Sequence, residues 1–277
     1  MADLAGAPRI AAVTTCKGRL EHLKQTLPRL MALPFDEVVV VDYDCPQGSG
    51  DWAEANCPGV RVVRVTEAPS FHCARARNLG AAATRAPWLL FIDADVLVEP
   101  DVLSVVRPLL RPGKFSRAAP LAKECWGTIF VSRADFDAVG GYDEVFRNWG
   151  GEDDDLVWSL KRIGRREVGF PGALVEPIPH SDALRTQHYA DQDRFGSGRR
   201  NGVYSLIKQA VVRQVGAIDL ATRQRLYDTV SQGVGREAVV ESFVVPLASG
   251  SLYGVAVETS LRFDLTQFGD PDIESGG

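Results

Sequence analysis

Residues 148–165, NWGGEDDDLVWSLKRIGR, place four carboxylates in a row behind a tryptophan and two glycines. Leu156, Leu160 and Ile163 fall at helical spacing, so we expect a helix that begins near Asp155. Acidic side chains are favourable at a helix N-terminus, but this explains one or two carboxylates rather than four. A carboxylate can act as a general base toward a hydroxyl, and neighbouring acids can hold the other hydroxyls of a polyol. Together with the aromatic ring and the glycine hinge, the stretch suits transfer of a group onto a sugar hydroxyl.

A second pair of carboxylates, Asp93 and Asp95, follows the apolar run 89–92. In an extended chain both would lie on one face. In a turn, one could bind a metal ion and the other a ribose hydroxyl or a water molecule. Oxygen ligands suit Mg²⁺ or Mn²⁺, and both cations bind diphosphate oxygens. The alternative is a turn with solvated acids, because the pattern D-x-D is common.

A histidine and a group of residues at the start of a helix could also take part in binding a metal ion or an anionic ligand. His180 lies in PIPHSD, where a neutral imidazole beside a carboxylate-bound cation would favour Mn²⁺ over Mg²⁺. His188 is the competing histidine. Arg75, Arg77 and Asn78 stand at the expected start of a helix, a place that favours anionic ligands, although a surface helix explains them equally well.

The elements that must position these residues alternate along the first half of the chain. Strands are expected at 9–15, 37–44, 60–66 and 87–100, and helices at 20–33 and 74–84. This order predicts a parallel α/β sheet, whose ligands bind beyond the carboxyl ends of the strands. Those ends carry Thr14, Asp42 and the acid pair, so polar groups converge on one edge of the sheet.

The second half has weaker signals. We expect a strand, a short helix and a Gly-Gly turn in 127–144, a mobile polar loop in 183–201, a helix in 203–215, strands around an ASGS turn in 241–265, and a frayed C-terminal end. We therefore expect a catalytic domain over 1–200, with a donor half at about 9–100 and an acceptor half at about 101–182. Residues 201–277 would form a helical and strand extension, and whether it packs on the same domain is left open.

Composition excludes several classes of protein. The 277 residues are 45% hydrophobic with a net charge of −5, and no long basic block favours a nucleic-acid surface. No run approaches the ~18 apolar residues of a membrane span, and the N-terminal residues lack a signal-peptide pattern, so we expect a cytoplasmic protein. The five cysteines form no CxxC pair, which favours buried thiols over disulfides or structural zinc; they are Cys16, Cys45, Cys57, Cys73 and Cys125.

Over residues 9–182 the chain resembles the GT-A class of nucleotide-sugar glycosyltransferases. Four motifs carry the resemblance in order: VTTCKGRLEHLKQTLP, RARNLGA, FIDADV and GGYDEVFRNWGGEDDDL. The last is similar to the acceptor motif of the β-1,4-galactosyltransferases and of bacterial chondroitin-polymerase-type transferases. The resemblance implies an α/β fold with a Rossmann-like, mostly parallel central sheet flanked by helices, followed by a C-terminal extension, and it favours a bacterial origin.

The resemblance also implies roles for individual residues. Asp153 would be the catalytic base. Asp95 and His180 would bind the cation, Mn²⁺ or Mg²⁺, although Pro177 replaces a further metal ligand of the animal enzymes. The acceptor would meet Trp149, Gly151, Glu152 and Asp154, and the donor nucleotide would meet Thr14, Asp42, Arg77 and Asp93.

These roles describe a metal-dependent, inverting transferase that moves a sugar from a UDP-sugar to an acceptor hydroxyl. A sugar nucleotidyltransferase is an alternative, but such enzymes carry a Gly-rich phosphate loop, and TTCKGRLEH has only Gly18. A catalytically silent module that binds a nucleotide sugar is another alternative, and it would not need Asp153. The sequence specifies neither the sugar, the acceptor nor the oligomeric state.

Overall fold

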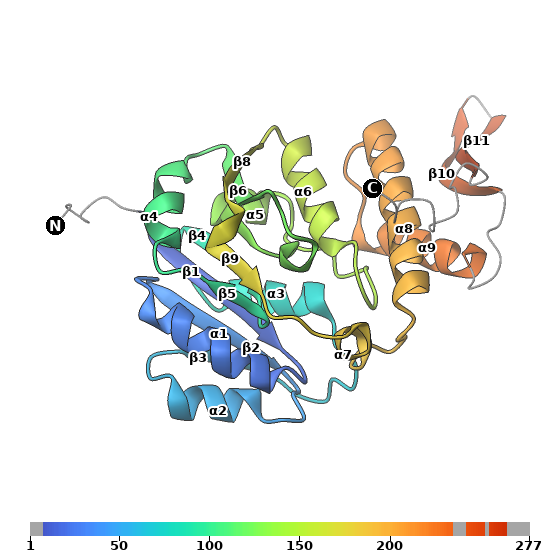
Figure 1. Cartoon of the computed structure of the whole chain (residues 1–277). Coiled ribbons are helices and arrows are strands. Elements are labelled where there is room, and N and C mark those ends of the chain that lie inside the picture. Colours follow the sequence, from blue (N-terminus) through green and yellow to red (C-terminus); the bar gives the residue numbers. More distant parts are fainter. Residues whose placement is uncertain (1–7, 235–241, 253–254, 265–277) are drawn as a thin grey trace. The chain divides into compact units, whose positions relative to one another are not determined.

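A seven-stranded sheet organises the larger of two units into which the chain divides (Figure 1). The computed structural model describes residues 8–234, 242–252 and 255–264. The larger unit comprises residues up to Glu144 together with Glu152–Gln192, and the second comprises Val145–Gly151 and the residues from Asp193 onward. The sheet has the order β3-β2-β1-β4-β7-β6-β8.

The first four strands of this sheet are parallel, and three of them, β1, β2 and β4, are buried between two layers of helices. Alternate residues of β1 enter opposite cores: Ile10 and Ala12 pack with α1, whereas Ala11 and Val13 pack with α3. This burial on both faces explains the continuous apolar runs of the sequence. The elements are β1 (Ile10–Cys16), α1 (Leu20–Ala32), β2 (Glu37–Tyr43), α2 (Ser49–Asn56), β3 (Arg61–Val65), α3 (Cys73–Ala82) and β4 (Trp88–Asp93).

Among the remaining strands of this sheet, β7 runs in the opposite direction: it is antiparallel to both β4 and β6, while β8 is parallel to β6. The sheet is therefore mostly parallel, as expected. Its further elements are α4 (Val102–Val106), η1 (Arg107–Leu109), β6 (Lys114–Ala119), η2 (Lys123–Cys125), β7 (Ile129–Ser132), α5 (Arg133–Ala138), α6 (Glu152–Arg162), β8 (Arg166–Pro171) and η3 (Gly172–Leu174). Leu156 and Leu160 of α6 join the α3 core.

A small antiparallel sheet joins β5 (Val96–Val98) to β9 (Val175–Pro177). Just beyond its ends, the backbone N–H of Ile178 donates to the carbonyl of Asp95 at 2.7 Å. This pairing brings the acid pair next to the segment that carries His180, which is followed by α7 (Asp182–Thr186).

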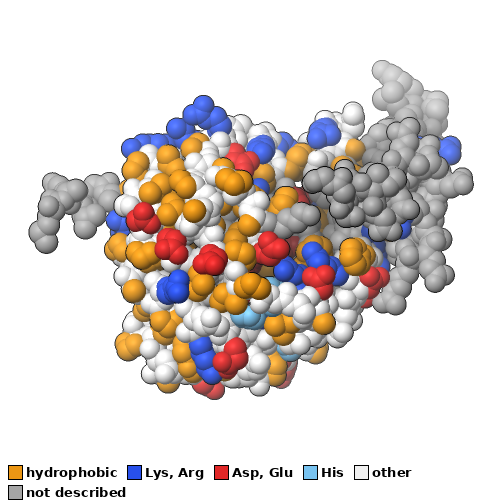
Figure 2. Space-filling view, viewed as in Figure 1, with side chains coloured by type: hydrophobic (Ala, Val, Ile, Leu, Met, Phe, Trp, Pro, Cys, Tyr) orange, Lys and Arg blue, Asp and Glu red, His pale blue; other side chains and the backbone are white. Residues whose placement is uncertain are grey.

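The second unit contains α8 (Arg194–Val215), α9 (Leu220–Gly233) and a hairpin of β10 (Ser242–Leu252) and β11 (Val255–Asp264). Its core includes Phe146, Tyr204 and Tyr227, and the ring of Tyr204 contacts the rings of both Phe146 and Tyr227. Loop 145–151 is therefore packed against α8 and α9. Within the described residues, no helix is long and apolar enough to cross a membrane. Figure 2 shows acidic, basic and hydrophobic side chains interspersed over the face in view.

All the strands and helices expected in the first half are present, but the expected strand 87–100 is divided. Strand β4 ends at Asp93, residues 94 and 95 form a turn, and β5 begins at Val96. The acid pair therefore occupies a bend. In the second half, the strand, helix and Gly-Gly turn of 127–144 are confirmed as β7 and α5, with Gly140 and Gly141 at positive φ.

Two expectations about helices were wrong. Helix α6 begins at Glu152 rather than near Asp155, so all four carboxylates lie in its first turn, where the helix dipole favours negative charge. Residues 183–201 are not a loop, because most of α7 and the start of α8 fall there. Both helices have N-cap residues: Ser181 accepts from the N–H of Leu184, and Asp193 accepts from that of Gly196.

The strands expected in 241–265 are present as β10 and β11, but the turn was misplaced. Residues 248–251, ASGS, lie within β10. The C-terminal end that was expected to fray lies outside the described residues.

Asn201 of α8 holds loop 145–151 and provides a test of this packing. Its fully buried amide nitrogen lies 3.0, 3.1 and 2.6 Å from the carbonyls of Arg147, Trp149 and Gly150, and its oxygen accepts from Tyr227 at 2.8 Å. Each buried polar group left unpaired costs about 1–3 kcal/mol, so we expect Asn201→Ala to lower the free energy of unfolding by about 2–4 kcal/mol. Urea denaturation measures the loss, and trypsin should then cleave faster after Arg147.

Gln209→Ala is the matched control for this prediction. Gln209 lies on the same helix, and its amide nitrogen donates to the Ser205 hydroxyl at 3.1 Å. We expect it to change the stability by less than about 1 kcal/mol. Equal effects of the two substitutions would contradict the role of Asn201 in holding the loop.

Candidate active site

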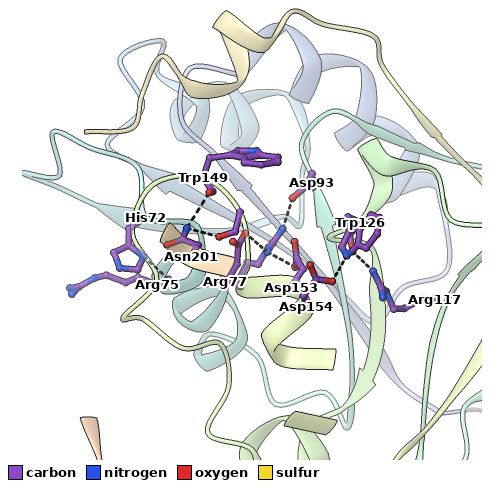
Figure 3. A network of polar contacts seen from close by, with 12 residues as sticks. His72, Arg75, Arg77, Asp93, Arg117, Trp126, Trp149, Asp153, Asp154 and Asn201 are labelled. Carbon is purple, nitrogen blue, oxygen red and sulfur yellow. Dashed lines mark hydrogen bonds and ion pairs between the residues drawn. The ribbon is translucent and has the colours of Figure 1, made fainter. Parts of the chain in front are cut away.

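Arg77 lies at the centre of a group of carboxylates at the edge of the large sheet (Figure 3). Its Nη1 donates to Asp153 Oδ1 at 2.7 Å and to Glu152 Oε1 at 3.3 Å. Its Nη2 donates to Asp93 Oδ1 at 2.8 Å. The guanidinium thus joins the end of β4 to the first turn of α6, and it is only 3% exposed.

The surroundings of Arg77 leave its guanidinium little freedom. The group lies over the ring of Tyr142, with 5.0 Å between the guanidinium carbon and the ring centroid. A Cβ on Gly127 would collide with Nη2 of Arg77 and would crowd the carboxylate of Asp93. Gly80, one turn further along α3, has no room for a side chain against Val13 of β1. Small residues therefore allow α3 to approach the sheet closely enough to bury an arginine.

Asp153 is the most strongly perturbed carboxyl of this group. Burial raises its pKa to about 7, and repulsion from Glu152 and Asp93 acts in the same direction, while Arg77 opposes the shift. Its side chain is 17% exposed, so it remains accessible to a substrate. A carboxyl with a pKa near neutrality is suited to accept a proton from a hydroxyl.

The two aspartates of the acid pair face different partners. Asp93 points to Arg77, whereas Asp95 Oδ2 lies 3.4 Å from His180 Nε2 and 3.7 Å from Arg19 Nη1. Burial raises the pKa of Asp95, and repulsion from Asp93 adds to the shift. The bend between β4 and β5 separates the two carboxylates in this way.

His180 has the geometry of a metal ligand. Its Nδ1 is 3.0 Å from the carbonyl oxygen of Ile178, which can only accept, so Nδ1 carries the proton. Nε2 is therefore the nitrogen left for a metal ion; it is buried and makes no hydrogen bond to the residues that the structure describes. Metal-binding histidines commonly donate their other N–H to a carbonyl in this way.

Asp95 and His180 therefore fit a divalent cation as two ligands. Among the described residues, no group of three or more His, Cys, Asp or Glu side chains is arranged to hold a metal ion. Other ligands would have to come from water or from a bound diphosphate. The competing histidine, His188, lies elsewhere: it packs on Gly18, and its carbonyl accepts from the N–H of Phe71.

The residues expected near the nucleotide differ in whether their polar groups already have partners within the protein. Both oxygens of Asp42 accept backbone N–H groups, from Cys45 at 2.8 Å and Gly50 at 2.7 Å, so its carboxylate shapes the loop before α2. The Thr14 hydroxyl is buried and has no hydrogen-bond partner among the described residues. Arg77 is committed to the carboxylates. The role of each in binding a nucleotide stays a prediction.

The residues expected at the acceptor divide between the two units. Asp154 Oδ1 accepts from the indole N–H of Trp126 at 2.7 Å in the larger unit. Trp149 and Gly151 belong to the second unit, where the Arg194 guanidinium lies 4.4 Å from the Trp149 ring centroid. Gly151 has φ +94° and no room for a side chain against Phe146, so a glycine is required there.

Sequence reasoning missed three residues that shape these regions. Lys17 follows β1 and donates to the carbonyls of Tyr43, Asp44 and Ala68, which ties the ends of neighbouring strands together. Trp126 and Asn201 were not singled out either. The sequence did contain two signals: Lys17 directly follows a buried strand, and Trp126 is followed by a glycine. Neither pattern specifies which residue the side chain will contact.

Comparison with known proteins shows which families the chain is similar to. Residues 11–119 match glycosyl transferase family 2, and residues 113–180 match the N-terminal domain of galactosyltransferase. β-1,4-Galactosyltransferase 1 of Mus musculus is 25% identical over 183 residues, which are 62% of this chain and 41% of the mouse protein. The chain thus spans about two fifths of the length of that curated relative.

Two solved structures share the fold. The mannosyltransferase PcManGT from Pyrobaculum calidifontis, in complex with GDP-Man and Mn²⁺, has a TM-score of 0.54 at 16% identity, covering 84% of this chain and 83% of that one. TarS of S. aureus, in complex with UDP-GlcNAc, has a TM-score of 0.58 at 13% identity, covering 80% and 71%. The chain therefore has the GT-A fold of nucleotide-sugar glycosyltransferases. Within that class it resembles the β-1,4-galactosyltransferases.

Substitution of Arg77 tests whether it neutralises the carboxylate group. Removing one partner of a buried ion pair typically costs about 3–5 kcal/mol, because the remaining charges are left uncompensated. We therefore expect Arg77→Met to lower the free energy of unfolding by about 3 kcal/mol at pH 8. The loss should be smaller at pH 5, where Asp153, with its raised pKa, is protonated and needs no counter-charge.

Urea denaturation at the two pH values measures both effects. Arg77→Lys is the control that keeps the charge but loses the forked geometry, and we expect it to be intermediate at pH 8. An Arg77→Met loss that is the same at pH 5 and pH 8 would show that packing, rather than charge, is what Arg77 supplies.

Proposed function

We propose that the chain is a metal-dependent, inverting glycosyltransferase that moves a sugar from a UDP-sugar to an acceptor hydroxyl, with Asp153 as the general base. The main support is the state of Asp153: its carboxylate is partly accessible, is fixed by Arg77 at 2.7 Å, and has a pKa raised to about 7 by burial. The similarity to β-1,4-galactosyltransferase 1 supports an acceptor that is a hydroxyl compound.

In the proposed reaction, the acceptor oxygen attacks the anomeric carbon from the face opposite the diphosphate. The new carbon–oxygen bond forms as the bond to the diphosphate oxygen breaks, and the electron pair leaves with the diphosphate. Asp153 takes the proton of the hydroxyl. The configuration of the anomeric carbon is inverted because attack and departure occur on opposite faces.

Arg77 has a positioning role in this scheme. It orients Asp153 and Asp93 at once, because Nη1 donates to the first carboxylate and Nη2 to the second. Glu152, 3.3 Å from the same guanidinium, is held beside them. Arg77 therefore acts through the carboxylates rather than by contact with the reacting atoms.

The leaving diphosphate needs positive charge at the edge of the sheet. Asp95 and His180 would hold the divalent cation, which when bound neutralises the negative charge of the diphosphate. Arg19 supplies a further cation at the same place: its Nη1 is 3.7 Å from Asp95, is buried, and makes no hydrogen bond within the described part of the chain. An arginine nitrogen in this state is available to a phosphate oxygen.

The choice of UDP and Mn²⁺ rests on similarity and chemistry together. A histidine beside a carboxylate favours Mn²⁺ over Mg²⁺, and PcManGT was solved with Mn²⁺. UDP-GlcNAc is bound by TarS, whereas PcManGT binds GDP-Man, so the fold accepts more than one nucleotide. The resemblance to galactosyltransferases favours UDP here.

Removal of the base tests the proposal. General base catalysis contributes about 10²–10⁴-fold, so Asp153→Asn should lower kcat by about that factor while UDP affinity changes little. Release of UDP from a UDP-sugar in the presence of saccharide measures the rate. Asp137→Asn, an exposed aspartate of α5, is the control and should keep full activity. Full activity of Asp153→Asn would remove this residue from the role.

The pH dependence follows from the raised pKa. Asp153 acts as a base only when ionised, so kcat/KM of the free enzyme should rise with pH, by about tenfold per unit below pH 7, and level off above it. Asp153→Asn should lack this inflection. A rate that is constant between pH 5 and pH 8 would contradict the assignment, because an aspartate of ordinary pKa is ionised throughout that range.

A further inference from the structure

Trp126 is an exposed aromatic ring that is nonetheless fixed in place. Its side chain is 39% exposed, yet its indole N–H donates to Asp154 Oδ1 at 2.7 Å. Its carbonyl accepts from Arg117 Nη2 at 3.0 Å, and the Arg117 guanidinium carbon lies 5.6 Å from the ring centroid. The ring is thus held by its own N–H, by its backbone and by a stacked cation (Figure 3).

A chain of ion pairs connects Arg117, the residue stacked on Trp126, to helix α6. Arg117 is 5% exposed and lies 3.8 Å from Glu167 of β8, measured from Nη1 to Oε1. Glu167 in turn pairs with Lys161 of α6 at 2.7 Å. The orientation of the indole is therefore coupled to the helix whose first turn carries Asp153 and Asp154.

The local backbone places the ring beside the carboxylates. Residues 125–128 form a turn in which the N–H of Thr128 donates to the carbonyl of Cys125 at 2.9 Å. Cys125 is fully buried, and Gly127 packs against Arg77 and Asp93. Trp126, between them, is the member of the turn whose side chain reaches solvent.

We propose that Trp126 and Asp154 form a subsite that binds a pyranose ring of the acceptor, with the indole beneath the CH face of the sugar. This proposal rests on the proposed function, because the subsite would position the acceptor of that reaction. The exposed face of an indole offers a flat apolar surface to the sugar's C–H groups, and a neighbouring carboxylate accepts hydrogen bonds from the sugar's hydroxyl groups.

The hydrogen bond between the two residues has a direct consequence for recognition. It fixes the angle of the ring and directs one oxygen of Asp154 toward Trp126. The carboxylate therefore cannot rotate freely to follow a substrate, and it discriminates among hydroxyl positions of the sugar. A tryptophan that only filled space would not need its N–H paired to a carboxylate at the protein surface.

Direct binding of saccharides tests the subsite without relying on turnover. The probes are the methyl β-glycosides of glucose, galactose, N-acetylglucosamine and mannose, titrated with UDP and Mn²⁺ present and followed by saturation-transfer NMR. Trp126→Ala should weaken binding of the best probe by about tenfold or more, because the stacking surface is lost. Trp126→Phe keeps a ring but loses the N–H, so it should weaken binding of the best probe by less, about threefold. Its affinity should also differ less from one glycoside to the next than the affinity of the wild-type protein does.

Trp158→Phe is the matched control. Trp158 lies on α6 and also has an arginine over its ring, Arg162 at 5.7 Å, but it is not part of the proposed subsite. It should bind the probes as the wild-type protein does. UDP affinity should be unchanged in all three variants, which verifies that they are folded.

Equal saccharide binding by Trp126→Ala and the wild-type protein would overturn the subsite, and so would the absence of binding of every probe to the wild-type protein. Failure of the proposed function has a different signature: saccharide binding that depends on Trp126, with no sugar transfer from any nucleotide sugar. Failure of the subsite alone would appear as transfer with an acceptor KM that Trp126→Ala does not change.

Discussion

One buried guanidinium determines the geometry on which the proposed chemistry depends. Arg77 pairs with Asp93 from the end of β4 and with Glu152 and Asp153 from the start of α6. Three carboxylates this close would repel one another without it, and a buried arginine without them would be unstable. The sheet edge and the helix are therefore fixed relative to each other by charge. The same burial keeps the pKa of Asp153 near neutrality despite its cationic partner.

The bend after β4 divides the acid pair between two tasks. Asp93 completes the Arg77 cluster, and Asp95 faces His180 through the short pairing of β5 with β9. The proposed base, Asp153, and the proposed cation ligands, Asp95 and His180, are thus carried by different elements. Loop 145–151, which carries two of the residues proposed to meet the acceptor, is supported in the second unit, where the Asn201 amide nitrogen lies within hydrogen-bond distance of three of its carbonyls.

The sequence predicted the parts of the fold that local patterns encode. Buried strands such as β1 and β2 read as continuous apolar runs, and the leucine spacing of α1 identified its inward face. The convergence of polar residues at one edge followed from the parallel order. The partners of Arg77 could not be predicted, because Asp153 is 76 positions away and the contact exists only in three dimensions. Helix α8 was missed in its first turns because glycine and arginine obscured the cap at Asp193.

The central claim is that this edge of the sheet binds a nucleotide diphosphate together with a divalent cation. Calorimetric titration of UDP and UDP-sugars in Mn²⁺, in Mg²⁺ and in chelator measures it most directly. The account predicts UDP binding in the micromolar range that requires Mn²⁺ and is lost in Asp95→Ala. The absence of nucleotide binding under every metal condition would contradict the account.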